Sequence, residues 1–161
     1  MKNNNSTQLV SVEDINKEHW NIYGRNYYSR YDYEEVDSDS ASKMMSHLKE
    51  YIVDKSTIGK TFNNYTVSLC DDFEYKDPID HSISKNQGLR FVFTDGSRII
   101  YRLSGTGSSG ATIRVYFDKY ESNKDLLDQD PQERLKDLVQ LALELSQLTK
   151  FTGREKPTVI T

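Results

Sequence analysis

The segment of this sequence best suited to chemistry is a run of glycines and hydroxyl side chains, Ser104-Gly105-Thr106-Gly107-Ser108-Ser109-Gly110. Glycines permit positive φ and leave backbone N–H groups accessible, while serine and threonine hydroxyls add further donors. Arg102 precedes the run and Arg114 follows it, both in expected strands. If Tyr101, Leu103, Ile113 and Val115 point to the core, both arginines project from the opposite face. A nest of amides and hydroxyls beside two guanidinium groups suits a phosphate dianion. The composition also leaves open a flexible glycine–serine connection beside two surface arginines.

Three glycines of this run, Gly105, Gly107 and Gly110, also fit the GxGxxG pattern of dinucleotide-binding proteins. That motif needs a helix directly after it, so that the pyrophosphate meets the helix N-terminus. The residues that follow here, ATIRVYF, are β-branched and aromatic and favour a strand. The context therefore argues against a dinucleotide site.

Other chemically capable side chains are more scattered. Asp77, Asp80 and His81 could bind a metal, but their order fits neither an EF-hand nor a zincin pattern, and a solvated loop is the favoured interpretation. His19 and His47 lie in expected helices, and neither has a serine or cysteine nucleophile nearby in the sequence. We therefore predict no catalytic residue, no metal ligand and no cofactor in this chain.

The composition limits the class of protein. A chain of 161 residues forms one ordinary domain, and 21 Lys and Arg against 25 Asp and Glu give a net charge of -4. This balance argues against a nucleic-acid binder that works by general electrostatic attraction. Cys70 is the single cysteine, which excludes an intrachain disulfide. The most apolar stretch, LVQLALEL, is too short to span a bilayer. We expect a soluble, cytoplasmic domain without nucleic-acid or membrane partners.

Apolar spacing and turn signals predict an α+β fold. Helices are expected over residues 12–23, from Ser38 or Ser40 to Val53, and from Pro131 to about Phe151. Strands are expected over residues 27–33, 65–69, 89–94, 98–103 and 111–120, with a weaker signal at 73–75 and a polar loop over 76–88. Because the strands come in neighbouring runs, we predict an antiparallel sheet with helices packed on it. Residues 1–10, rich in asparagine, are expected to be a disordered leader.

The strongest local signal is a hairpin in which Asp95-Gly96 separates two apolar strands. A two-residue turn would make both faces of this hairpin apolar. One face would have Leu89, Phe91, Phe93 and Ile100, and the other Val92, Ile99, Tyr101 and Leu103. Since an antiparallel sheet commonly keeps one face polar, a partner or another part of the protein is expected to cover the second face. A different turn register would weaken this inference.

The stretch RLSGTGSSGATIR, residues 102–114, resembles the phosphate-binding loop in the C-terminal domain of eukaryotic-type phosphoglucomutases, in the α-D-phosphohexomutase superfamily. The likeness extends through GRNYYSRYDYEEV, FEYKDPIDHSISKNQGLRFVFTDGSR and PTVIT, and covers roughly residues 11–161. It implies a sheet of about four strands, similar to the TATA-box-binding-protein fold, in a phosphate-binding domain over residues 26–161. Residues 11–25 would be a helix and hinge that match the end of the family's third domain.

The resemblance also implies a function and a set of site residues. Such domains bind the phosphate that is not being transferred when glucose 1-phosphate and glucose 6-phosphate interconvert through glucose 1,6-bisphosphate. The full enzymes use Mg²⁺ and the bisphosphate, and the other mutase domains are the expected partners. The residues carried over to this chain by position are Arg102, Ser104, Gly105, Thr106, Ser108 and Arg114.

The departures from the family are large. This chain lacks the family's phosphoserine loop, its aspartate-rich Mg²⁺ loop and its sugar-recognition loop, so we expect the chain alone to be inactive. His81 stands where the family usually has glycine, and Ser109 where it usually has alanine. The alternative function is a non-catalytic module that binds anions or docks onto a mutase.

Overall fold

The structure, a computed structural model, describes residues 9–107 and 110–161. The expected leader therefore lies mostly outside the described residues. The helices are α1 (Val12–Tyr23), α2 (Ser38–Val53), α3 (Pro131–Ser146) and α4 (Leu148–Thr152). The strands are β1 (Arg25–Val36), β2 (Thr61–Phe62), β3 (Tyr65–Asp72), β4 (Tyr75–Lys76), β5 (Ile83–Ser84), β6 (Leu89–Phe93), β7 (Arg98–Gly107), β8 (Gly110–Glu121) and β9 (Val159–Ile160).

The main sheet has seven strands in the order β2-β3-β6-β7-β8-β1-β9, and every pairing in it is antiparallel. The predicted α+β fold with an antiparallel sheet is confirmed, although the sheet is larger than the expected four strands. The short edge strands β2 and β9 have two residues each, too few to show a sequence alternation. A separate two-stranded hairpin, β4–β5, projects from the body as an arm.

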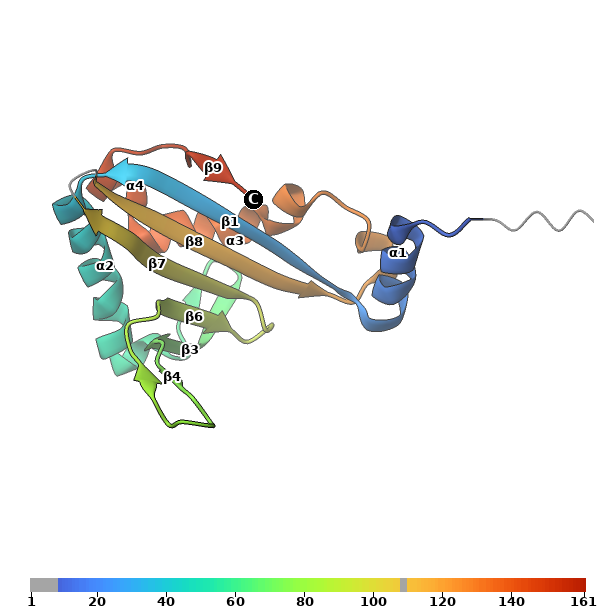
Figure 1. The fold of residues 1–161 in the computed structure, drawn as a ribbon, viewed down its shortest axis with the longest axis horizontal. Coiled ribbons are helices and arrows are strands. Elements are labelled where there is room, and N and C mark those ends of the chain that lie inside the picture. Colours follow the sequence, from blue (N-terminus) through green and yellow to red (C-terminus); the bar gives the residue numbers. More distant parts are fainter. Residues whose placement is uncertain (1–8, 108–109) are drawn as a thin grey trace, which may run out of the picture.

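Helices cover one face of the main sheet and leave the other open (Figure 1). Helix α2 contacts β3, β6, β7 and β8, while α3 contacts β1 and β8. The core lies between these two layers. Its largest fully buried side chains include Tyr27, Tyr33, Met44, Leu48, Phe91, Phe93, Tyr101, Leu135 and Leu138. The central strands therefore have a buried side and a side on the open face, and Arg30, Arg90, Arg98, Arg102 and Arg114 lie on the open side.

The β6–β7 hairpin differs from the two-residue turn that the sequence analysis assumed. Phe91 pairs with Ile99 and Leu89 with Tyr101, so a three-residue loop joins the strands. The left-handed conformation of Gly96, φ 83°, makes this longer loop possible. The shift of one residue brings the buried side chains of both strands to one face, and the expectation of two fully apolar faces is wrong.

The C-terminal helix is also interrupted. A single helix was expected from Pro131 to about Phe151, but Gln147 adopts φ 48° and ends α3. The short helix α4 follows, and its first residue, Leu148, remains fully buried against the core. The interruption redirects the chain toward Gly153 and the segment that leads to β9.

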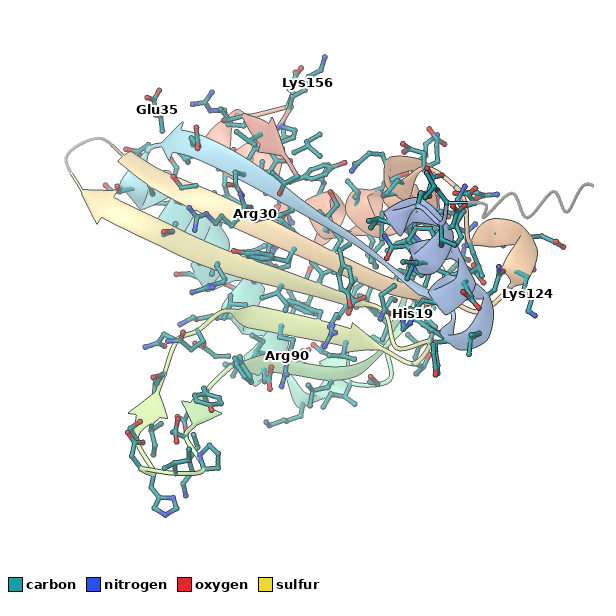
Figure 2. The ribbon with its side chains drawn as sticks, turned by 45° about the vertical axis from the view of Figure 1, so that its right-hand side comes forward. His19, Arg30, Glu35, Arg90, Lys124 and Lys156 are labelled. Carbon is teal, nitrogen blue, oxygen red and sulfur yellow. The ribbon has the colours of Figure 1, made fainter. Side chains whose placement is uncertain are left out.

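Helix α1 lies at one end of the molecule, away from the core (Figures 1 and 2). Its N-terminus has a capping box between Ser11 and Asp14, yet none of its residues is buried. Lys17 forms an ion pair of 2.8 Å with Asp128, and the Arg25 guanidinium lies 4.1 Å from the centre of the Trp20 ring. In the described part of the chain, no helix has both the length and the apolar character required to cross a membrane.

Candidate functional site

Strands β7 and β8 bring the two arginines of the predicted site together. Arg102 and Arg114 are direct cross-strand partners. Their neighbours Tyr101, Ile113 and Val115 are buried on the helix-covered side, so both arginines project from the open face. The sequence-based expectation that they share this face is confirmed. Two guanidinium groups side by side create a local positive potential that favours an anion.

The described residues of the glycine-rich run extend the two strands. Strand β7 continues to Gly107 and pairs there with Gly110, the first residue of β8. Gly105 has φ 67° and forms a β-bulge, because the pairing shifts between Ser104 and Thr106. Ser104 is half-buried at the base of this hairpin. The side chain of Thr106 and the whole of Ser108 lie outside the described part of the chain, and so do their predicted contacts.

Asp32 of β1 is a site residue that the sequence analysis missed. Its carboxylate is almost fully buried and accepts a hydrogen bond of 2.9 Å from Arg30 Nε. Its other oxygen, Oδ2, lies 3.7 Å from Arg114 Nε. A carboxylate so placed restrains the orientation of Arg114 and offsets part of its charge. The alternation of Arg30 and Asp32 with Tyr31 and Tyr33 in the sequence was the available signal.

Arg102 differs from the other arginines of the open face in its charge environment. Arg90 forms two hydrogen bonds with Asp71, of 3.0 and 2.7 Å, and this pairing raises the pKa of the Arg90 guanidinium. Arg98 donates to Asp118 at 2.6 Å. Among residues 9–107 and 110–161, no carboxylate lies within ion-pair distance of Arg102. Arg102 therefore contributes the least compensated positive charge on this face.

The open face has two hollows next to these arginines. One, of ≈ 420 Å³, lies between the sheet and the β4–β5 arm and is lined by Arg102, Tyr116 and Phe73 among others. The second, of ≈ 450 Å³, includes Arg30, Arg98 and Tyr116 in its lining. Figure 2 shows Arg30 and Arg90 on this side of the sheet. Arg30, Arg98 and Arg102 thus lie beside open space that a ligand can enter.

Two phenol groups buried on the covered face behind the site, those of Tyr33 and Tyr101, do not supply acid–base chemistry. Burial raises the pKa of Tyr33 to about 12 and also raises the pKa of Tyr101. Both hydroxyls therefore stay protonated near neutral pH. The arrangement of charges and donors is suited to binding an anion.

The acidic residues of the β4–β5 arm stabilise its turn. Asp77 Oδ1 accepts hydrogen bonds from the backbone N–H groups of Ile79, at 2.7 Å, and of Asp80, at 3.2 Å. Ser82 donates its N–H to Asp80 at 2.8 Å, and its hydrogen bonds lower the pKa of that carboxyl. These local contacts support the solvated-loop interpretation. No group of three His, Cys, Asp or Glu side chains that could bind a metal occurs in the described ranges.

The remaining candidates lie apart from one another. His19 stacks near Tyr23 on α1, whereas His47 packs near Tyr51 on α2. Cys70, on β3, is half-buried, and burial raises the pKa of its thiol. A reactive cysteine needs a lowered pKa, so Cys70 lacks the character of a nucleophile.

Comparisons with known proteins agree on one family. Residues 25–158 match the family model described as the C-terminal domain of phosphoglucomutase-1. The chain is 58% identical to phosphoglucomutase-1 of Dictyostelium discoideum over 164 residues, which cover 98% of this chain and 29% of that protein. It is 56% identical to human phosphoglucomutase-1 over 160 residues, with 97% and 28% covered. It is also 56% identical to the chloroplastic phosphoglucomutase of Arabidopsis thaliana over 154 residues, with 96% and 25% covered.

A solved structure agrees with these relatives. The open form of pp63/parafusin from Paramecium, described as an exocytosis-sensitive phosphoprotein and a phosphoglucomutase, superposes with a TM-score of 0.84 at 49% identity. The superposition covers 99% of this chain and 26% of the Paramecium protein. The chain thus spans between 25% and 29% of the length of these proteins. On sequence and structure together, this chain belongs to the family of phosphoglucomutase C-terminal domains.

Proposed function

We propose that this chain is the phosphate-binding C-terminal domain of a phosphoglucomutase that interconverts glucose 1-phosphate and glucose 6-phosphate. The pairing of Arg102 with Arg114 on the open face, beside Ser104 and the bulge at Gly105, is the observation that carries the proposal. Two guanidinium groups and a hydroxyl provide charge-assisted donors for the phosphate that is not being transferred. The proposed clamp residues are Arg102, Ser104, Gly105, Thr106, Ser108 and Arg114.

The same proposal assigns the remaining chemistry to other domains of the full enzyme. Phosphoryl transfer requires an acceptor and a charge-stabilising metal ion. Mg²⁺ and glucose 1,6-bisphosphate would be used there, as the resemblance to the full enzymes of the family implies. The role of this domain is therefore to bind and orient the substrate's distal phosphate, which raises the effective concentration of the reacting group.

The proposed function also implies a division of the chain into two parts. Residues 26–161 would form the phosphate-binding domain, and residues 11–25 the end and hinge of the preceding one. Two features support the division: α1 has no buried residue, and the family model begins at residue 25. Gly24, with φ 80°, ends α1 directly before β1. Val12, Ile15 and Ile22 of α1 are more than half exposed, as expected for a surface that packs on another domain.

The exposed apolar residues of α1 also favour the second candidate function, a non-catalytic module that docks onto a mutase. This function would need α1 to bind a separate chain, whereas the first function needs a phosphate clamp. The two candidates therefore differ in which surface responds to a sugar phosphate.

An NMR titration with glucose 6-phosphate, with glucose as the matched ligand that lacks phosphate, tests the clamp. We expect selective shifts of amides within residues 102–114 and an affinity on the order of millimolar, or about 4 kcal/mol, because an isolated domain leaves the loop open to water. Arg114→Ala should weaken binding and flatten its salt dependence. Arg98→Ala is the control, since Arg98 is on the same face but paired with Asp118. Equal shifts with both ligands would contradict the proposal.

The inactivity of the isolated chain has its own test. Purified chain mixed with glucose 1-phosphate, Mg²⁺ and glucose 1,6-bisphosphate should show no mutase turnover above background. Turnover that survives removal of contaminating mutase would show that the chain contains a complete active site.

A further inference from the structure

Strand β1 has a β-bulge at the base of the candidate phosphate loop. Tyr33 pairs with Ile113 of β8, and Val36 pairs with Ala111, so β1 has one more residue than β8 between these two pairs. The bulge at Gly105 in β7 faces the same step of β8 from the other side. Both neighbours of β8 therefore bulge at the same level, next to the pair formed by Gly107 and Gly110.

The two bulges differ in the residue that adopts positive φ. Gly105 has φ 67°, which glycine adopts at little cost. Glu35 has φ 53°, a left-handed conformation that is unfavourable for a residue with a Cβ atom. Its side chain is exposed, so packing of that side chain does not explain the conformation. Another contact must hold the backbone of Glu35 in place.

Arg154 makes that contact. Its Nη2 donates to the carbonyl oxygen of Glu34 at 3.0 Å and to that of Glu35 at 3.3 Å. Arg154 is itself fixed after α4, because its backbone N–H donates to Thr152 Oγ1 at 3.1 Å and its carbonyl accepts from Thr149 Oγ1 at 3.0 Å. Figure 2 shows Glu35 at the end of β1, and Figure 1 shows that the segment after α4 starts at this same end of the sheet.

The bulge in turn touches the phosphate hairpin through Gly110. A Cβ atom at Gly110 would lie 3.0 Å from the carbonyl oxygen of Val36 and 3.3 Å from Glu35 Cα. Gly110 has φ 93°, so its backbone is also in a glycine-only conformation. The backbone of the hairpin thus packs directly on the backbone of the bulge. A change in the bulge must move Gly110 or open a gap beside it.

We propose that Arg154 is a positioning residue for the phosphate hairpin, which it supports by holding the Glu34–Glu35 bulge against Gly110. The inference rests on the proposed function, because it assigns a role in phosphate binding to a residue that need not touch phosphate. The guanidinium suits this role, since its Nη2 group alone has two N–H donors and lies within reach of both carbonyl oxygens. Arg154 determines the geometry of the clamp through backbone contacts.

The test compares Arg154→Met with the double variant Arg154→Met/Glu35→Gly. In Arg154→Met, we expect the Gly110 and Ala111 amide resonances of the ligand-free protein to shift and the affinity for glucose 6-phosphate to fall about fivefold, or about 1 kcal/mol. Adding Glu35→Gly should restore most of the affinity, because glycine adopts the bulge conformation without support. Arg154→Met/Glu34→Gln is the matched control: it removes a neighbouring carboxylate without relieving positive φ, and should not restore affinity.

Rescue distinguishes positioning from direct contact with phosphate. If Arg154 bound phosphate by its charge, Glu35→Gly would not compensate for its loss, and that result would overturn the inference. Unchanged Gly110 resonances together with unchanged affinity in Arg154→Met would also overturn it. Should Arg154→Met fail to fold, Arg154→Lys keeps the charge but loses the planar guanidinium that places Nη2 beside both carbonyl groups, and an about twofold loss of affinity with a Gly110 shift is expected. Unchanged binding and an unshifted Gly110 in that variant would overturn the inference as well.

The ligand-free spectra separate this inference from the proposed function. If the unmodified chain gives no phosphate-specific shifts, the proposed function fails. The response of Gly110 to Arg154→Met and its reversal by Glu35→Gly still decide whether Arg154 supports the hairpin.

Discussion

The two hairpins that share β7 are stabilised in different ways. In the β6–β7 hairpin, Phe93 N donates to Ser97 O at 2.9 Å and Gly96 N donates to Phe93 O at 3.0 Å. Asp95 Oδ1 accepts hydrogen bonds from the backbone N–H and the hydroxyl of Ser97 at 3.0 and 2.5 Å. Apart from the Thr94 N–H, which donates to Thr66 O of β3 at 2.9 Å, these hydrogen bonds of the turn join neighbouring residues. Ser97, which takes part in three of them, is completely buried.

The β7–β8 hairpin depends on distant parts of the chain. Asp32 of β1 lies beside Arg114, and Arg154 reaches the bulge across 120 positions of sequence. The charged side chain of Arg102 remains exposed at its base. In a turn whose polar groups bond to one another, few hydrogen-bond donors and acceptors remain for a ligand. In a hairpin that is held in place by residues of other segments, the donors stay available to bind one. The comparison therefore separates a structural turn from a binding element.

The largest loss of stability is expected in the β6–β7 hairpin. Phe91→Ala removes a ring that is fully buried in β6, and should lower the free energy of unfolding by about 3–5 kcal/mol. Val92→Ala is the control on the open face and should cost less than about 1 kcal/mol. Chemical denaturation followed by circular dichroism measures both values. Equal losses for the two variants would contradict the assignment of the covered face.

The second-largest loss of stability is expected where the β7–β8 hairpin contacts β1. Gly110→Ala places a Cβ atom 3.0 Å from the carbonyl oxygen of Val36 and strains φ, so we expect a loss of about 2 kcal/mol in stability. The same change should shift amides along residues 102–114 and weaken glucose 6-phosphate binding. Denaturation and NMR titration measure the two effects. A variant with unchanged stability would show that the hairpin does not pack on the bulge.

A matched pair of glycines then tests the division of roles directly. Gly96 and Gly105 have φ 83° and 67°, and a Cβ atom at either would meet nothing within 4 Å. Gly96→Ala and Gly105→Ala should therefore cost a similar amount of stability, about 1 kcal/mol, from backbone strain alone. Only Gly105→Ala should weaken phosphate binding. Weaker binding in Gly96→Ala of the same size would contradict the comparison.

The contrast between local and long-range contacts also explains which features the sequence could predict. Alternation along the strands correctly predicted that Arg102 and Arg114 share the face opposite Tyr101 and Ile113, because a strand's period of two is a local property. The position of the Asp95-Gly96 turn was also predicted. Its register was not, because two- and three-residue loops both accept glycine at a positive φ.

The supporting residues could not be predicted from local pattern. Glu35 adopts a conformation that its residue type does not favour, and Arg154 lies far along the chain, beyond the helix that was expected to end at about Phe151. Their roles depend on which carbonyl groups the fold brings within reach of one guanidinium. Such information belongs to tertiary structure, where long-range contacts override local preference.

The smallest change in stability is expected in the third hairpin, the β4–β5 arm. The hydrogen bonds of its turn come from neighbouring residues, but one of these residues has an unfavourable backbone conformation. His81 has φ 60°, and its N–H donates to Asp77 O at 3.1 Å. His81→Gly should remove the left-handed strain and keep this backbone hydrogen bond. Because glycine also gains entropy in the unfolded chain, the net stabilisation should be only about 0.5–1 kcal/mol. Ser84→Gly, in the adjacent strand β5, is the control and should destabilise the protein, since no positive φ is relieved there.

Thermal unfolding measures the stability of both variants, and phosphate binding should stay unchanged in each. A loss of stability in His81→Gly would mean that the imidazole makes contacts that outweigh the strain, and this arm would then join the β7–β8 hairpin among turns whose conformation is supported from outside.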